Sequence, residues 1–510
     1  MRILLAIITS LLMLPGAAQD TLLFSPEYKT SRDMAQVGAL AFDSLFFFEF
    51  EEIDAREDAI YLSKIEYATM QQTWRERIDI PQITDCEQNF RYLIPFADYF
   101  ILFTTGIRKE NNHIEAYASF IDFSGKLKTQ PILVHKVPAD NRASQPRFTV
   151  EVSPNKKYFI TFFDPPFERK TNETFEFRCY SPDLDLIWEK NLELPYAQDI
   201  VQVHNYLLDN SANVYLMSGE KPSRSSNSFL KSQAGRYEVF YYNHIENKLE
   251  EYDVSLKDKN IISIQFDLNA QNELVIAGFY TNNFNFSVAG TFYFRLLPEA
   301  KDLAAAAYMA LPKKLLELYL NEREMQKDKS INDLFLDHLV IEENGNTLLI
   351  GERYYITERM MNDISTGRQY IEYTYHHGDI IALQLNDAGK INWASSIAKN
   401  QSRLNNYAQH YGYHFGKKGD DWMFFFNDSK DNQERLSSKP DGSASSWNGS
   451  QNSVTTRVQL SSGGQINRFI SRDNKQSDEL LQPELTDFEP NQPLLLGFST
   501  GKSVRFGLYD

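Results

Sequence analysis

The densest group of oxygen-bearing side chains in this chain follows the apolar run Trp422–Phe426. Asn427, Asp428, Asp431 and Asn432 come in quick succession, and carboxylate and amide oxygens are the ligands that Ca²⁺ prefers. Their spacing does not fit the D-x-[DN]-x-[DN]-G calcium loop, and no Glu stands at its bidentate position. We therefore expect a turn capped by its own side chains, and we take Asn427, Asp428 and Asn432 as candidate binding residues.

The histidines offer two patterns that resemble metal sites. His376 and His377 are adjacent, so in a strand they point to opposite faces and cannot chelate one ion. His410 and His414 are four residues apart, which on a helix would place both rings on one face, as in H-E-x-x-H zinc sites. The surrounding run 407–415 alternates and is rich in aromatic residues, which favours a strand, where the rings would be about 13 Å apart. We expect no metal site.

A third motif, Gly497–Gly501, matches the G-x-S-x-G pattern of a serine nucleophile at a strand-to-helix turn. That geometry needs a helix after the serine and a downstream histidine. The residues after Gly501 read as a strand and contain no His. The same stretch also has one residue too few between its glycines for a phosphate-binding loop. We predict turn glycines in a hairpin, and we assign no catalytic residue.

Two further candidates, Glu352 and Tyr354, follow the apolar strand run 347–351. A polar residue at such a strand end either is solvated or lines a channel or pocket, and both alternatives stay open.

The elements that must position these residues are strands. Aromatic and β-branched residues dominate short runs separated by turns rich in Asn, Asp, Gly and Lys, which is a strand and hairpin pattern. The strongest runs are Leu45–Phe50, Tyr158–Phe163, Glu238–Tyr242, Leu274–Tyr280 and Trp422–Phe426.

These strands form a unit that repeats: an apolar strand, a polar turn, a second strong strand, a third strand, and a hairpin leading to a fourth strand that often carries Trp. Six such units close on Trp74, Thr129, Trp188, Glu251, Trp393 and Arg468. The one long gap, between Glu251 and Trp393, contains a seventh unit near Ile261–Leu297. We predict an all-β propeller of about seven blades, in a range of about six to eight, because radial packing buries both faces of each small sheet. Two tandem β-sandwiches are the alternative.

The ends and the insertions complete the predicted architecture. The last run, from Pro493, reads as strands that pair with the first mature strands and close the ring. Residues 299–329 predict a short helical insertion, with strong helix propensity at Ala304–Ala307 and a second helix beginning at Pro312. Residues 433–465, rich in Ser, Asn, Gly and Gln, predict a mobile surface loop. We assign residues 19–510 to a single propeller domain.

The segment 378–401 is similar to the repeats of quinoprotein-like and WD40-like propellers, with a D-x-G-K turn at Asp387–Lys390 and a following Trp393. The chain resembles secreted, mostly uncharacterised bacterial propellers of this kind. Their recurring segments resemble GERYY (351–355), W-x-x-x-I-x-K-x-Q (393–401) and FFNDSKDN (425–432). The resemblance implies the fold and the compartment, and it adds Lys399 and Gln401 to the candidate binding residues. Adjacent cysteines and an evident calcium-ligand set are lacking, so we expect no quinone and no other cofactor.

The first residues and the composition of the sequence indicate the compartment and limit the kinds of partner that we expect. Arg2, the apolar run 3–14 and small residues at 16–18 predict a secretory signal peptide over residues 1–18, with an uncleaved anchor helix as the alternative. No later stretch is apolar enough to span a membrane. The formal net charge of −17 argues against nucleic acid as a partner. The only cysteines, Cys86 and Cys179, are either paired or buried as free thiols.

We expect an exported protein of the periplasm, the outer cell surface or the extracellular space. The leading hypothesis is a non-catalytic binding or scaffold propeller that contacts a protein or a glycan through one face. The alternative is a polysaccharide hydrolase or lyase with acidic residues in the channel. An enzyme should place two or more carboxylates around the central pocket, which separates the two hypotheses.

Overall fold

The computed structural model of the chain describes residues 22–29, 37–41, 45–53, 56–139, 146–164, 170–220, 237–282, 287–297, 302–327, 330–362, 367–405, 409–438, 442–486, 493–500 and 503–509. The predicted signal peptide, residues 1–18, lies outside these ranges. The protein is all-β, as predicted, with only short helices between its many antiparallel strands. None of the helices in the described ranges has the length and apolar character that a membrane crossing requires.

Eight sheets of four or five strands follow one another along the described residues, and we number them 1 to 8. Sheet 1 contains β3 (Val37–Ala41), β4 (Leu45–Ile53), β5 (Arg56–Glu66) and β6 (Gln71–Asp79). Sheet 2 contains β7 (Cys86–Pro95), β8 (Tyr99–Arg108), β9 (His113–Asp122) and β10 (Ile132–Pro138). Sheet 3 contains β11 (Phe148–Val152), β12 (Phe159–Phe163), β13 (Asn172–Tyr180) and β14 (Leu186–Ala197). Sheet 4 contains β15 (Val201–Leu208), β16 (Val214–Glu220), β17 (Tyr237–Asn243) and β18 (Lys248–Val254).

The second half of the chain repeats this order. Sheet 5 contains β19 (Asn260–Leu268), β20 (Leu274–Thr281), β22 (Gly290–Leu297) and β23 (Asp302–Ala310). Sheet 6 contains β25 (Leu334–Ile341), β26 (Thr347–Asn362), β27 (Gln369–Leu385), β28 (Ile391–Ile397) and, paired with β27, β29 (Gln401–Leu404). Sheet 7 contains β30 (His414–Lys418), β31 (Asp421–Asp428), β32 (Val454–Leu460) and β33 (Ile466–Asp473). Sheet 8 contains β34 (Leu480–Leu481), β35 (Leu494–Ser499), β36 (Ser503–Tyr509), β1 (Leu22–Phe24) and, paired with β36, β2 (Tyr28–Lys29).

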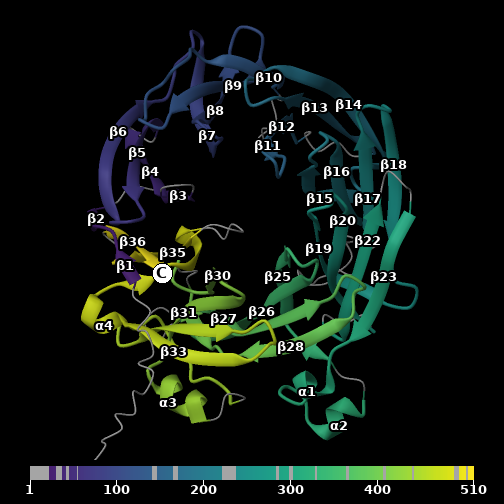
Figure 1. Ribbon diagram of the computed structural model, residues 1–510, viewed down its shortest axis with the longest axis vertical. Helices are drawn as coiled ribbons and strands as arrows, with labels where there is room; N and C mark the ends of the chain where they lie inside the picture. The colour runs from purple at the N-terminus through teal and green to yellow at the C-terminus, as the bar shows by residue number, and fades with distance from the viewer. Residues whose placement is uncertain are drawn as a thin grey trace, which may run out of the picture.

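The remaining elements are short. They are the strand pair β21 (Ser287–Val288) and β24 (Ile331–Asn332), and the helices α1 (Lys313–Leu316), α2 (Glu322–Met325), α3 (Asp431–Ser438), α4 (Asn474–Ser477) and η1 (Pro483–Leu485). Figure 1 shows the large sheets arranged around a ring, with the first strand of each of sheets 1 to 7 toward the middle and the fourth strand at the outside.

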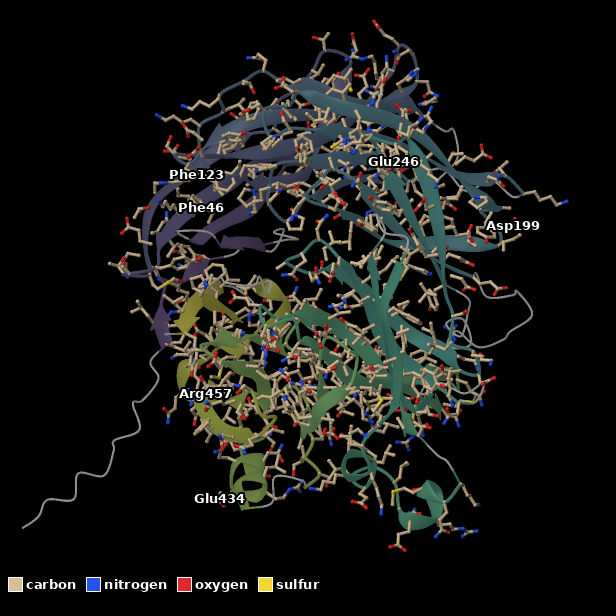
Figure 2. All side chains as sticks on the ribbon, turned by 45° about the vertical axis from the view of Figure 1, so that its right-hand side comes forward. Phe46, Phe123, Asp199, Glu246, Glu434 and Arg457 are labelled. Carbon is tan, nitrogen blue, oxygen red and sulfur yellow. The ribbon has the colours of Figure 1, made fainter. Side chains whose placement is uncertain are left out.

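The core of the protein lies between the sheets. A separate cluster of buried apolar side chains fills each interface between neighbouring sheets, and one of these clusters joins sheet 8 to sheet 1. At the interface of sheets 1 and 2, for example, the ring centroids of Phe46 and Phe123 are 5.4 Å apart (Figure 2). The second strands β12 and β20 are buried along their whole length, because both of their faces meet a neighbouring sheet. The predicted propeller fold and the five predicted strand runs are confirmed.

The two ends of the chain meet in sheet 8, as predicted. Strand β1 pairs antiparallel with β36, with Leu22 opposite Tyr509 and Phe24 opposite Gly507. The seven units expected from the sequence correspond to sheets 1 to 7, and the closing strands add a sheet of their own. Sheet 8 has no counterpart in the repeated sequence pattern, because strands from opposite ends of the chain build it.

The expected helical insertion is only partly correct. Ala304–Ala307 belongs to strand β23, which pairs with β22 and completes sheet 5, so the helix expected there is wrong. Helix propensity is a weak preference that a ladder of cross-strand hydrogen bonds overrides. The second helix is present as α1, with Pro312 as its N-cap residue.

The surface loop expected over 433–465 is also wrong for much of its length. Helix α3 covers its first residues, and Val454–Leu460 forms the buried strand β32 of sheet 7. In β32 the polar Thr455 and Thr456 are buried together with Val454, Val458 and Leu460, so a polar composition did not indicate a surface position. The segment 407–415, expected as a strand, is a turn over 409–413, and strand β30 begins at His414.

Two smaller expectations are also settled. Gly497 lies inside strand β35 rather than in a turn, where a Cβ atom would be 2.4 Å from the Cβ atom of Leu485. Its role is therefore close packing against η1, while Gly501 lies outside the described residues. Cys86 and Cys179 are buried free thiols in different sheets, which decides between the two alternatives left open by the sequence.

Ring closure can be tested at Phe506, which is 0% exposed and lies in the cluster between sheets 8 and 1. We expect Phe506→Ala to lower the free energy of unfolding by about 3–5 kcal/mol, because it leaves a cavity in this interface. Phe469→Ala, at a position 38% exposed on β33, is the matched control and should cost less than about 1 kcal/mol. Urea denaturation of both variants measures the difference, and equal losses would contradict a closed core.

Candidate functional site

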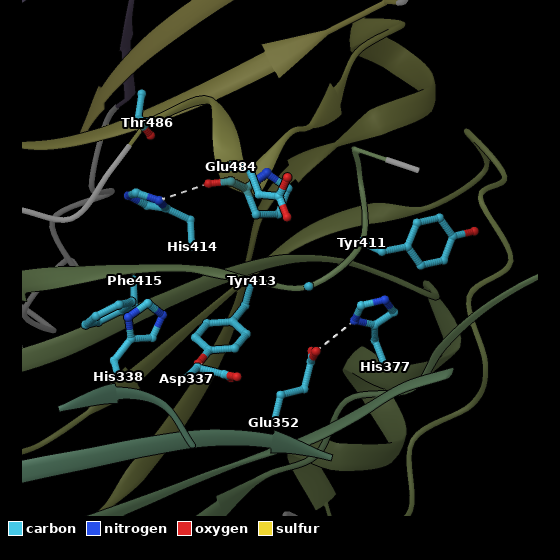
Figure 3. A pocket seen from close by; sticks show the side chains of 12 residues that line it. Asp337, His338, Glu352, His377, Tyr411, Tyr413, His414, Phe415, Glu484 and Thr486 are labelled. Carbon is cyan, nitrogen blue, oxygen red and sulfur yellow. Dashed lines mark hydrogen bonds and ion pairs between the residues drawn. The ribbon is translucent and has the colours of Figure 1, made fainter. Parts of the chain in front are cut away.

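A cavity of about 350 Å³ is lined by residues of sheets 6 and 7, of the turn before β30 and of the segment 483–486 (Figure 3). Its polar side chains come from five segments of the chain. The lining residues are Asp337, His338, Glu352, His377, Tyr411, Gly412, Tyr413, His414, Phe415, Pro483, Glu484 and Thr486. The cavity therefore brings together three carboxyl groups and three imidazoles.

Irregularities in the strands position the acidic residues. Asp337 is the unpaired residue of a β-bulge in β25, where the register shifts between Leu336 and His338. A second register shift occurs in the pairing of β26 with β27, between Glu352 and Tyr354. Bulges turn side chains out of the regular alternation, and here they occur beside both carboxyl groups.

Glu352 is the centre of a buried ionic network. The Lys399 ammonium, whose side chain is 0% exposed, lies 2.5 Å from its Oε1 atom. The imidazole Nδ1 of His377 is 2.7 Å from its Oε2 atom, as Figure 3 shows. Burial alone would raise the pKa of Glu352, but the Lys399 charge and the His377 hydrogen bond outweigh burial and hold the pKa below its ordinary value. Glu352 is therefore ionised at neutral pH.

Asp337 has the opposite protonation behaviour. Burial, and then the negative charge of Glu352, raise its pKa to about 7. The hydroxyl of Tyr413 donates a hydrogen bond to its Oδ2 atom at 2.8 Å, which limits the rise. In Figure 3, Asp337 and Glu352 lie on the same side of the cavity. In acid–base active sites, two neighbouring carboxyl groups commonly have different environments, which raise the pKa of one and keep the pKa of the other low.

The imidazoles of His338 and His414 stay neutral at physiological pH. Burial lowers the pKa of each to about 4. The ring Nδ1 of His414 is 3.3 Å from the carbonyl oxygen of Pro483, so the neutral ring donates to it. These two histidines therefore add aromatic surface and hydrogen-bonding groups, but no charge.

Four of the residues predicted from the sequence join in one network beside the cavity. Beyond its contact with Glu352, the Lys399 ammonium donates to Gln401 Oε1 at 3.2 Å. The Gln401 amide donates to the carbonyl oxygen of Asn427 at 2.8 Å, and it accepts from the Gly412 backbone N–H at 2.9 Å. This series of contacts from Glu352 to Asn427 therefore fixes the turn on which Tyr411 and Tyr413 line the cavity.

The other predicted residues lie at the edge of this network or outside it. The ring of Tyr354 is 4.9 Å, centroid to centroid, from that of His377. Asp428 pairs with Arg468 and accepts from the Asn432 amide, so these residues hold the turn after β31 and do not line the cavity. This agrees with the turn bonded by its own side chains that the sequence predicted.

Sequence reasoning missed Asp337, Tyr413 and the role of His377. His376 and His377 do lie on opposite faces of β27, as predicted. His376 pairs with Tyr355 of β26, and His377 pairs with Tyr354. The signal available for Asp337 was the pair Asp337 and His338 within the otherwise apolar run LFLDHLVI. His410 and His414 do not share one strand, because the turn ends before β30.

No family model matches the chain, and no curated protein matches it either. Solved structures that resemble it are propeller-like and very distant in sequence. A europium-containing methanol dehydrogenase is 8% identical, with 93% of this chain and 84% of that chain covered and a TM-score of 0.43. A Penicillium chrysogenum alpha-L-arabinanase complexed with arabinobiose is 9% identical, with coverages of 65% and 92% and a TM-score of 0.34. A Bacteroides caccae protein of unknown function is 11% identical, with coverages of 68% and 92% and a TM-score of 0.28.

The ionic network can be tested by removing its cation. We expect Lys399→Met to lower the free energy of unfolding by about 3–5 kcal/mol, because it leaves the buried Glu352 carboxylate without its partner. Adding Glu352→Gln to this variant should restore part of the loss. The matched control is Lys128→Met, which removes an ion pair of the same 2.5 Å length at the surface and should cost less than about 1 kcal/mol. Urea denaturation distinguishes these outcomes, and a Lys399→Met loss no larger than the control would contradict the network.

Proposed function

We propose that the cavity is an acid–base site that cleaves a glycosidic bond in a neutral saccharide. The observation that carries the proposal is the pair of carboxyl groups at one cavity, Asp337 with a pKa of about 7 and Glu352 with a pKa below its ordinary value. Glycoside hydrolysis uses such a pair: one carboxylic acid protonates the leaving oxygen, and one carboxylate supports attack at the sugar carbon.

In this reaction the two carboxyl groups carry out the chemical steps, and the residues around them orient them or keep them charged. Asp337 donates its proton to the glycosidic oxygen, and the Tyr413 hydroxyl orients it. Glu352 stabilises the positive charge that develops on the sugar ring and either attacks that carbon or deprotonates a water molecule. Lys399 and His377 keep Glu352 ionised. If Glu352 has attacked the sugar carbon, the Asp337 carboxylate then takes a proton from a water molecule whose oxygen displaces Glu352 from that carbon. If Glu352 has instead deprotonated the attacking water, it releases that proton to solvent and Asp337 regains one from solvent.

A neutral saccharide suits this cavity better than an acidic one. Asp337, Glu352 and Glu484 all line it, and the formal net charge of the chain is −17, so an anionic substrate would be repelled. The rings of Tyr411, Tyr413 and Phe415 line the same space. Aromatic side chains combine an apolar face with a polar edge, which matches the apolar faces and hydroxyl groups of a sugar.

Non-catalytic binding, the leading hypothesis from the sequence, is the second candidate. The pairing of Glu352 with both Lys399 and His377 favours it, because a carboxylate engaged on both oxygens is well suited to a fixed structural role. In that case the same cavity holds a saccharide without turnover. We also propose that the protein acts after export, and the support for this remains the sequence of residues 1–18.

The acid–base role predicts a specific pH profile. Because Asp337 must carry a proton, activity should fall as pH rises through its pKa of about 7. It should fall on the acid side only below the ordinary pKa of a Glu, about 4.3, because the pKa of Glu352 is lowered. The measurement is the release of reducing ends from arabinan, xylan, mannan, galactan and β-glucan across this pH range.

The matching substitution is Asp337→Asn. We expect it to lower kcat by about 10²–10⁴-fold while preserving substrate binding, because it removes only the transferable proton. Asp122→Asn, at the end of β9 in sheet 2 and away from the cavity lining, is the control and should retain full activity. Unchanged turnover in Asp337→Asn would refute the catalytic role, and binding without turnover by the unaltered protein would establish the non-catalytic function instead.

A further inference from the structure

The second and third strands of sheet 6 extend far beyond their neighbours. Strands β26 and β27 contain 16 and 17 residues, whereas β25 and β28 contain 8 and 7. The pairing of β25 with β26 ends at Arg353, and that of β28 with β27 ends at Ile380. From Tyr354 to Asn362, β26 therefore pairs only with β27, whose other edge carries β29. We call this part the hairpin extension.

The register divides the hairpin extension into two faces. The first, which we call the His377 face, contains pairs of opposed residues that begin at the cavity and continue outward. They are Tyr354 with His377, Ile356 with Tyr375, Glu358 with Tyr373, and Met360 with Ile371. The other, the His376 face, contains Tyr355 with His376, Thr357 with Thr374, Arg359 with Glu372, and Met361 with Tyr370.

The His377 face carries more exposed apolar side chains than the His376 face. Ile356, Met360, Ile371 and Tyr373 on this face are exposed by 47%, 67%, 44% and 37%. On the His376 face, only Tyr355 and Tyr370 are both large, apolar and exposed to that degree. A contiguous exposed apolar surface on a protruding hairpin is typical of a binding surface.

This surface is continuous with the candidate site. His377 lines the cavity and contacts Glu352, and on the same face Tyr354 packs against its ring. Strand β29 widens the face, because Gln401 pairs with His377 and Arg403 with Tyr375. The ring of Tyr411, over the cavity, is 5.9 Å from that of His377. The His377 face therefore begins at the wall of the cavity.

We infer that the His377 face binds a linear neutral polysaccharide whose end enters the cavity. The inference rests on the proposed function, and it names the substrate as a polymer rather than a free small sugar. Tyr373 and Tyr375 occupy alternate positions of one strand, about 7 Å apart, and the buried His377 follows at the cavity wall, so two accessible rings lead a chain toward the cavity. Glu358 and Arg403 carry opposite charges on this face, which suits an uncharged chain.

The test compares two double variants with matched exposure. Tyr373→Thr with Ile371→Thr alters the His377 face at positions 37% and 44% exposed. Tyr355→Thr with Tyr370→Thr alters the His376 face at positions 37% and 46% exposed. Thr preserves strand propensity, and equal thermal unfolding of the two variants confirms equal folding. Each is assayed for KM on a neutral polysaccharide from the panel above and on the disaccharide of the same linkage.

We expect the His377-face variant to raise KM for the polysaccharide by about tenfold, as the loss of two aromatic or apolar contacts would. Its KM for the disaccharide should be unchanged, and the His376-face variant should match the unaltered protein with both substrates. Affinity electrophoresis in gels containing the polysaccharide gives a second readout that does not depend on turnover.

The outcomes separate this inference from the proposed function. If the unaltered protein cleaves the polysaccharide but both double variants behave alike, the inference is overturned and the acid–base site stands. Equal KM values for polymer and disaccharide would overturn it in the same way, as would self-association lost only in the His377-face variant, which would identify a protein interface. If no saccharide is bound or cleaved, the proposed function fails and takes the inference with it.

Discussion

The structure depends on one constraint: each sheet has two apolar faces and cannot shield either of them alone. Each pair of neighbouring sheets solves this by sharing a cluster of buried side chains, so every sheet is stabilised from both sides. Such an arrangement has exposed faces at its first and last sheets unless it closes. The cluster between sheets 8 and 1 and the pairing of β1 with β36 meet that need. The free energy of closure therefore depends on contacts between the two ends of the chain.

The same constraint explains where the candidate site lies. Residues of sheets 6 and 7 line the cavity, together with the segment 483–486 that follows β34 of sheet 8. Burial between sheets also places charged groups in a low-dielectric setting, where each must find a partner. Lys399 lies against Glu352 and keeps it ionised, whereas burial and the charge of Glu352 outweigh the hydrogen bonds that Asp337 accepts and raise the pKa of Asp337 to about 7. The difference between the two carboxyl groups is thus a consequence of how the sheets pack.

Much of the fold could be predicted from the sequence, because strand alternation and turn chemistry are local. The central strands and the seven repeated units were recognisable in this way. Two kinds of feature were not. Ala304–Ala307 has helical propensity but completes sheet 5, since pairing with β22 outweighs a local preference. Sheet 8 lacks the repeated ending, because its strands come from both ends of the chain.

The site shows the same division between local and long-range information. Glu352 could be singled out because it follows a strong apolar run, although the strand end expected there is wrong and β26 continues to Asn362. Lys399 and Gln401 could be singled out because they stand in a recurring segment. Their contacts with one another could not be predicted, since they depend on how β27 and β29 pair. The protonation of Asp337 depends on residues still farther away in the sequence, since the hydrogen bond that it accepts comes from Tyr413, 76 residues away. Its position on a β-bulge could not be recognised from the pattern of apolar and polar residues. A residue whose chemistry is set by burial and by remote partners is visible in the sequence only as a charge in an apolar run. Such an exception in a buried strand is therefore the first place to look for a functional group in a protein of this kind.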